Sequence, residues 1–142
     1  MVRQKIMNAG LRVTPQRMVI LDAIQGMNNH PTADDIYLAI HPANPGISMA
    51  TVYKTLETYV DSGLLQKVYT REGQMRYDPR IDNHGHIYCT NTGEIIDFYD
   101  DELNKIITAF FRKKKVSNIR ISNISLQINA LKTDPGKSIS IK

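Results

Sequence analysis

The sequence predicts an α+β protein, with an N-terminal winged helix-turn-helix followed by a small α/β domain. In the first half, apolar residues recur at helical spacing between capping residues. After residue 64 they fall in short alternating runs separated by glycine and asparagine, as in hairpins. With 142 residues, 42% of them hydrophobic and 23% charged, the chain suits one ordinary globular domain or two small ones.

Three helices are expected in the first half, each opened by a residue that caps helix N-termini. Thr14 precedes a proline at the first helical position, and Gly26 marks the end of that helix. Thr32 caps the second helix. Ser48 caps the third, which Gly63 stops. The residues expected to be buried are Met18, Ile20, Leu21, Ile24, Ile36, Leu38, Ile40, Val52, Leu56, Tyr59 and Val60.

Two hairpins are expected after the third helix. The runs LLQKVYT and QMRYD flank REG and form the wing of the winged helix. The runs HIYCT and EIIDF flank NTG. With the turn at Asn91-Thr92, paired residues have numbers that sum to 183, which places His86 opposite Asp97.

The last third predicts one helix and one strand. DDELNKIITAFFRKKK suits a helix whose basic end is solvated, and its inward residues are expected to be Leu103, Ile106, Ile107 and Phe110. The stretch 116–131 alternates in part, as a strand does. The predicted domains are a winged-helix domain at 1–78, a hinge at 79–84, a second domain at 85–131 and a flexible tail at 132–142.

The third helix is the candidate for reading DNA, because the second helix of a helix-turn-helix enters the major groove. Its outward residues Thr51, Tyr53 and Lys54 suit contacts with bases or phosphates. Arg12 and Arg17 lie where the preceding segments would cross the DNA backbone. The alternative is that these are ordinary solvated side chains on a small helical bundle.

Histidines and carboxylates gather around the second hairpin. His84 and His86 project from one face of an extended segment, Asp97 is the partner of His86, and Asp78 ends the wing. Imidazole with carboxylate is a ligand set for Fe(II), Mn(II), Co(II) or Zn(II). The alternative is a group of surface side chains that binds nothing.

The lengths of the apolar runs, the cysteine count and the net charge bear on the class of protein. No apolar run is long enough for a transmembrane helix, and the N-terminus lacks a secretory signal. The single cysteine cannot form an internal disulfide, which fits the cytoplasm. The net charge of +4 is compatible with a polyanionic partner without requiring one.

The motifs VTPQR, HPTADDIY, SMATVYKTLETYVDSGL, RYD, HGHIYC and GEIIDF, in this order and spacing, resemble the ferric uptake regulator (Fur) family. The resemblance runs from about Arg12 to Phe98. It implies a cytoplasmic homodimer that binds a palindromic operator in double-stranded DNA as a metal-dependent repressor, and not an enzyme. Within the family, the peroxide-responsive (PerR) branch is the more similar, because Asp97 stands where iron sensors typically have glutamate.

The resemblance also implies a regulatory metal site. His30 in HPTADDIY matches the ligand from the DNA-binding domain, Asp78 the hinge-side ligand, and His84, His86 and Asp97 the remaining three. Fe(II) or Mn(II) is the implied metal, with Zn(II) expected in some purified preparations. In the peroxide-responsive branch, Fe(II) and peroxide oxidise ligand histidines, and the matching candidates are His30 and His84.

The chain departs from the family at the structural zinc, which two CxxC pairs usually hold. Only Cys89 remains, with Thr92 in the second place and INALKTDPGK in the matching C-terminal region. One thiolate cannot make a four-cysteine site, so no structural zinc is expected and Cys89 is predicted to be a small buried hydrophobe.

Three alternative functions stay open. The first is a Fur-like sensor of iron, manganese or zinc without peroxide chemistry. The second is a non-haem iron enzyme, which would need a substrate pocket with a convergent polar lining. The third is a DNA-binding protein that has lost metal sensing altogether.

Overall fold

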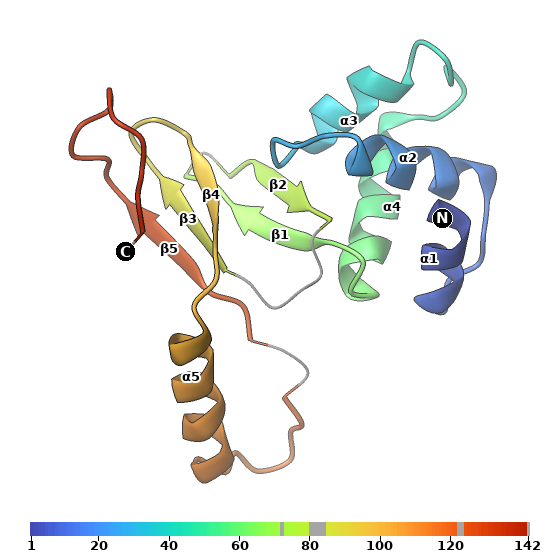
Figure 1. Cartoon of the computed structure of the whole chain (residues 1–142). Coiled ribbons are helices and arrows are strands. Elements are labelled where there is room, and N and C mark those ends of the chain that lie inside the picture. The colour runs from blue at the N-terminus through green and yellow to red at the C-terminus, as the bar shows by residue number, and fades with distance from the viewer. Residues whose placement is uncertain (72, 80–84, 122–123, 142) are drawn as a thin grey trace. The chain divides into compact units, whose positions relative to one another are not determined.

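The computed structural model describes residues 1–71, 73–79, 85–121 and 124–141 (Figure 1). The chain divides into two compact units, Met1–Asp82 (unit 1) and Asn83–Lys142 (unit 2). Helices come first, and a sheet with one helix follows, so the predicted α+β class is confirmed. Residues 80–84 of the predicted hinge, including the candidate ligand His84, lie outside the described residues.

Unit 1 is a helical bundle with a two-stranded wing. Its elements are α1 (Val2–Asn8), α2 (Pro15–Gln25), α3 (Ala33–Ile40), α4 (Met49–Asp61), β1 (Gln66–Tyr69) and β2 (Met75–Asp78). The three predicted helices begin at their predicted caps: Thr14 accepts from the Arg17 amide, and Ser48 from the Thr51 amide. At the start of α3, Thr32 and Asp35 form a reciprocal capping box.

Helix α1 was not predicted. It has no side-chain cap, and polar residues fill most of it. Its single buried residue, Ile6, is fully enclosed in the core of unit 1. The helix is therefore stabilised by tertiary packing of one side chain, which local sequence patterns do not reveal.

The core of unit 1 takes one stripe from each of α2, α3 and α4. Ile20, Ile36 and Leu56 are completely buried within it. The prediction that Leu38 is buried was wrong, since its side chain is 69% exposed. Leu38 lies two residues from Ile36, and two residues turn a helix by about 200°, so it faces away from the core.

Unit 2 is a three-stranded sheet and one helix. Its elements are β3 (Gly85–Cys89), β4 (Ile95–Phe98), α5 (Asp101–Lys113) and β5 (Gln127–Ala130), with strand order β4-β3-β5. The predicted hairpin register is confirmed, because β3 and β4 are antiparallel with His86 opposite Asp97. β5 pairs with the other edge of β3 in parallel.

Two predictions for unit 2 were wrong in part. Among the described residues of 116–131, the expected strand covers only Gln127–Ala130, the stretch that pairs with β3, while Ile119 and Ile121 are exposed. Helix α5 forms as expected, but none of its residues is buried; Ile106 is 60% and Phe110 55% exposed. Its apolar stripe follows helical spacing, yet the described part of the chain does not cover it. No helix in the described ranges is long and apolar enough to cross a membrane.

Candidate metal centre

One imidazole and one carboxylate are paired within unit 1. His30 lies in the loop between α2 and α3, and its Nε2 is 3.5 Å from Oδ2 of Asp78 at the end of β2. The Asp78 side chain is 4% exposed and that of His30 13%. A carboxylate so poorly solvated needs charged or hydrogen-bonding neighbours, and His30 is one of them.

The loop that carries His30 is fastened to the wing strand. The Arg76 guanidinium donates to the carbonyls of Asn29 (3.4 Å) and His30 (3.3 Å), and the Tyr77 amide donates to the Pro31 carbonyl (2.9 Å). His30 itself has φ of 51°, in the left-handed region. That conformation costs on the order of 1–2 kcal/mol for a residue with a side chain, so the contacts with β2 stabilise it.

A second imidazole–carboxylate pair lies within unit 2. Nε2 of His86 on β3 is 3.4 Å from Oδ1 of Asp97, its cross-strand partner on β4. His86 is 4% exposed and the Asp97 side chain 29%. The pairing depends on hairpin register, because a shift of one residue would turn Asp97 to the opposite face of the sheet.

His30, Asp78, His86 and Asp97 are therefore the candidate donors that the described residues contain. Two neutral imidazoles with two carboxylates suit Fe(II), Mn(II) or Zn(II) and are poorly matched to soft, thiolate-seeking metals. The lone Cys89 is 2% exposed, as predicted for a small buried hydrophobe. With one cysteine in the whole sequence, a four-cysteine zinc site cannot form within the chain.

The residues predicted to read DNA all lie in unit 1. On α4, Tyr53 (49% exposed) and Lys54 project into solvent, while Thr51 is half-buried with its hydroxyl 3.0 Å from that of Ser48. At the start of α2, the Arg17 guanidinium donates to the Arg12 carbonyl (2.7 Å), which brings these two residues together.

Two contacts hold α4 in place. The Tyr59 hydroxyl donates to the Arg17 carbonyl on α2 (2.5 Å), and burial raises the pKa of that hydroxyl. Lys67 on β1 forms an ion pair with Glu57 on α4 (2.8 Å), and the hydrogen bond to Glu57 raises the pKa of Lys67. α4 is thereby tied to α2 at one point and to the wing at another.

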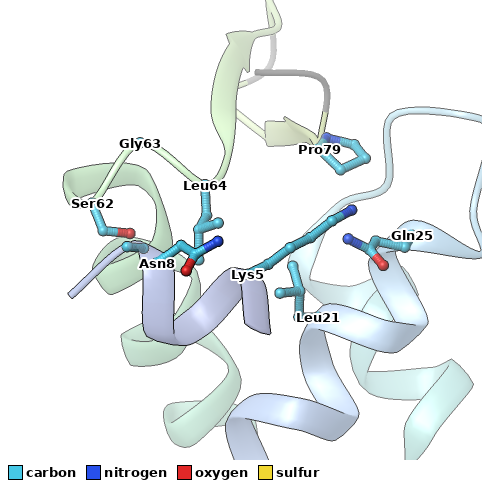
Figure 2. Close-up of a pocket in the computed structure, with 9 residues that line it drawn as sticks. Lys5, Asn8, Leu21, Gln25, Ser62, Gly63, Leu64 and Pro79 are labelled. Carbon is cyan, nitrogen blue, oxygen red and sulfur yellow. The ribbon is translucent and has the colours of Figure 1, made fainter. Parts of the chain in front are cut away.

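A cavity of about 310 Å³ lies beside α1 in unit 1 (Figure 2). Its lining includes Lys5, Leu21, Gln25, Leu64 and Pro79. Figure 2 shows the Lys5 side chain extending toward Gln25 and Pro79. None of the candidate metal donors lines this cavity, so it is separate from the His30–Asp78 pair.

Comparison with known proteins shows which family the chain belongs to. The profile of the ferric uptake regulator family matches residues 8–129, which is most of the chain. The chain belongs to the ferric uptake regulator family. Family members are regulators, so the expectation that this chain is not an enzyme follows from its membership.

Individual relatives include proteins of two kinds. Over 98 residues the chain is 42% identical to the peroxide-responsive repressor PerR of Staphylococcus aureus (strain Mu50), a match that covers 69% of this chain and 66% of that protein. The chain thus spans slightly less than two thirds of this relative. The ferric uptake regulator of Pseudomonas aeruginosa with manganese superposes with a TM-score of 0.78 at 28% identity, covering 94% of this chain and 100% of that one. The Campylobacter jejuni peroxide stress regulator gives 0.69 at 26% identity, covering 93% of each chain.

Two residues close to the candidate donors in the sequence of this Fur-family chain were not predicted to have a role. Arg76 fastens the His30 loop, and nothing in the sequence distinguishes it from a solvated arginine. Gly85 stands between His84 and His86, and a glycine inside a predicted strand is itself a signal of close backbone approach.

Proposed function

We propose that this protein is a dimeric, metal-dependent transcriptional repressor that senses peroxide through oxidation of ligand histidines. The observation that carries the proposal is the presence of one imidazole–carboxylate pair on each unit, His30 with Asp78 and His86 with Asp97, in which Asp78 and His86 are buried. All four stand at the positions that match regulatory ligands in the family resemblance.

The donor set fits a divalent cation of borderline hardness. In each pair the nitrogen and oxygen lie 3.4–3.5 Å apart, so both can turn toward one ion with little movement. In this proposal the two pairs, together with His84, hold the same Fe(II) or Mn(II). An all-nitrogen-and-oxygen set of five suits these metals, and Zn(II) can occupy it in purified protein.

Sharing one ion between the units would couple metal binding to DNA binding. A ligand shifts a conformational equilibrium only by its differential affinity for the two states. His30 and Asp78 belong to the unit that carries α4, whereas His86 and Asp97 belong to the other unit. Ligation by both pairs would therefore favour one relative arrangement of the units over all others.

DNA binding is assigned to α4 and the start of α2. Exposed Tyr53 and Lys54 on α4, with half-buried Thr51, would face the major groove. The proximity of Arg17 to Arg12 would place two cations near one stretch of phosphate backbone. The ties of α4 to α2 and to the wing support the proposal, because a recognition helix must be rigidly held.

Self-association is assigned to unit 2. Its exposed large apolar side chains include Ile106, Phe110, Phe111, Ile119, Ile121, Ile124, Ile128 and Leu131. Exposed apolar groups gathered on one unit indicate a surface that another protein covers. A second copy of the chain suits a palindromic operator, since two-fold symmetry in the protein matches two-fold symmetry in the DNA.

Bound Fe(II) would activate peroxide beside the imidazole ligands and would return to Fe(II) at the end. A histidine ring would supply the two electrons: one oxygen atom of the peroxide would be added at a ring C–H bond, and the other would leave as water. The residues proposed to be oxidised are His30 and His84. An oxidised ring is a poorer donor, so the metal and the DNA would be released together.

The test uses duplexes selected from a random pool in the presence of Mn(II), with binding measured by fluorescence anisotropy. The proposal expects binding with Fe(II) or Mn(II), none after chelation, and loss after peroxide only in the Fe(II) sample. Mass spectrometry should then locate one added oxygen on His30 or His84. If peroxide changes neither the DNA binding of the Fe(II) sample nor the mass of His30 and His84, the proposed sensing of peroxide is overturned.

A second candidate function is a manganese or iron sensor without peroxide chemistry. It is favoured by the similarity to a Fur protein solved with manganese. The variant Asp97→Glu separates the candidates, because glutamate is the typical residue of iron sensors at this position. The peroxide proposal expects Asp97→Glu to keep metal-dependent DNA binding and to lose much of the response to peroxide. A plain metal sensor would show no response in either protein.

A further inference from the structure

Strand β5 pairs with β3, the strand that carries His86, from His86 to Cys89. The His86 amide donates to the Leu126 carbonyl (3.0 Å), just before β5, and the Thr90 amide donates to the Ala130 carbonyl (2.9 Å) at its end. Between these bonds the two strands pair in parallel, with His86 opposite Gln127. The backbone of His86 therefore depends on where β5 lies.

Gly85 allows β5 to approach this closely. A Cβ at position 85 would lie 2.7 Å from the Leu126 carbonyl oxygen and 3.2 Å from the Leu126 Cβ. That distance is far shorter than an ordinary contact, so any side chain at 85 would displace the Leu126 carbonyl. The same carbonyl accepts the His86 amide, so displacing it would also disturb the candidate ligand.

The far end of β5 is held by a polar latch, formed by Asn91, Glu94 and Lys132. The Asn91 side chain donates to the Lys132 carbonyl (3.0 Å) and accepts from the Lys132 amide (2.9 Å). The Lys132 ammonium donates to Glu94 (2.8 Å), and its side chain is only 10% exposed. The latch thus joins the β3–β4 turn to the segment that follows β5.

We propose that β5 is a brace for the metal-binding hairpin, seated by Gly85 at one end and by Asn91 at the other, and that both act as positioning residues for His86. The consequence for metal binding rests on the proposed function. Neither residue would touch the metal. Each would act through the backbone bond that fixes His86 against Asp97, and residues that orient a ligand commonly change metal affinity by about 10–100-fold.

The brace itself is tested in metal-free protein by amide hydrogen exchange. Gly85→Ala and Asn91→Ala should each speed exchange at His86, Thr90 and β5, and leave α2 and α4 unchanged. The matched controls are Gly46→Ala, where an added Cβ meets open space, and Asn129→Ala, whose side chain contacts Gln127 on its own strand. Unchanged exchange in Asn91→Ala would overturn the brace even if Gly85→Ala failed to fold.

Positioning is tested by titration with Mn(II) and by the absorption bands of bound Co(II), which report ligand geometry. Asn91→Ala and Gly85→Ala should bind Mn(II) about tenfold more weakly or worse, with altered Co(II) bands, while the controls match the wild type. Faster amide exchange in these two variants, with Mn(II) affinity and Co(II) bands unchanged, would overturn the positioning role of Gly85 and Asn91. A wild-type protein that binds no Mn(II) would instead overturn the proposed function, and the exchange result would still decide the brace.

Discussion

The two units use the same kind of apolar pattern in opposite ways. In unit 1 the stripes of α2, α3 and α4 meet in a shared core, where Ile20, Val52 and Leu56 are fully buried. In unit 2 the stripe of α5 is just as regular, yet the helix has no buried residue. A stripe of apolar residues at helical spacing predicts that this face of the helix is covered, but it does not predict which part of the chain, or which other protein, covers it. Unit 1 covers its own stripes, and we infer that unit 2 is completed by a second copy of the chain.

The largest difference between the units is expected from truncating one side chain in each. Leu56→Ala should lower the free energy of unfolding of unit 1 by about 3 kcal/mol, because it leaves a cavity in a closed core. Ile106→Ala should change the stability of monomeric protein by less than about 0.5 kcal/mol, since its side chain is already 60% exposed. Urea unfolding followed by amide exchange resolves the two units. Equal losses would contradict the comparison.

A charge on α5 should separate the copies without unfolding either unit. Phe110→Asp puts a carboxylate on the exposed apolar face of unit 2, where desolvating it in an interface is costly. Self-association should weaken by about tenfold or more, as measured by sedimentation velocity across protein concentrations. The control Leu38→Asp alters a side chain that is also exposed, at 69%, but lies on unit 1. Equal weakening of self-association in Phe110→Asp and Leu38→Asp would contradict the proposal that the apolar face of unit 2 is the surface of self-association.

Helix caps should matter more where the helix is packed. Thr32 caps α3 and Asp100 caps α5, each accepting from the backbone amide three residues later. Thr32→Ala should cost about 1 kcal/mol of global stability, because α3 forms part of the core of unit 1. Asp100→Ala should only fray the exposed start of α5, which circular dichroism and exchange of its first turn would detect. A global loss in Asp100→Ala would indicate that α5 is packed within the chain.

The smallest expected effect concerns acid titration of the latch in unit 2. The hydrogen bond from Lys132 lowers the pKa of Glu94 below its ordinary value of 4.5. A lowered pKa in the folded state contributes stability above the ordinary pKa, and this is lost as pH falls through the folded value. Carbon-detected NMR should therefore find Glu94 titrating below 4.5, and Lys132→Met should move it back toward 4.5. A wild-type Glu94 that already titrates at 4.5 would mean that the latch is open in solution.

The sequence predicted local features well and long-range packing poorly. The caps at Thr14, Thr32 and Ser48 are local signals, and all three begin the expected helices. The hairpin register that pairs His86 with Asp97 followed from one short turn. Helix α1 was missed because it depends on burial of Ile6 in a core built from distant residues.

The candidate donors illustrate the same limit at the level of a site. The pairing of His30 with Asp78 joins residues 48 positions apart, and only the family resemblance suggested it. Arg76, which holds the His30 loop, has no sequence pattern of its own. The glycine at position 85 signals a close backbone approach, but the sequence does not show that Leu126 is the residue that approaches it.

Mn(II) stoichiometry tests most directly whether the pairs on the two units hold a single metal ion, as proposed. Isothermal titration and electron paramagnetic resonance would count tightly bound Mn(II) in the wild type, in His30→Ala of unit 1 and in His86→Ala of unit 2. We predict one ion per chain at this site in the wild type, and its loss in each variant alone. A variant of one unit that still binds Mn(II) with wild-type affinity through the pair on the other unit would contradict the account.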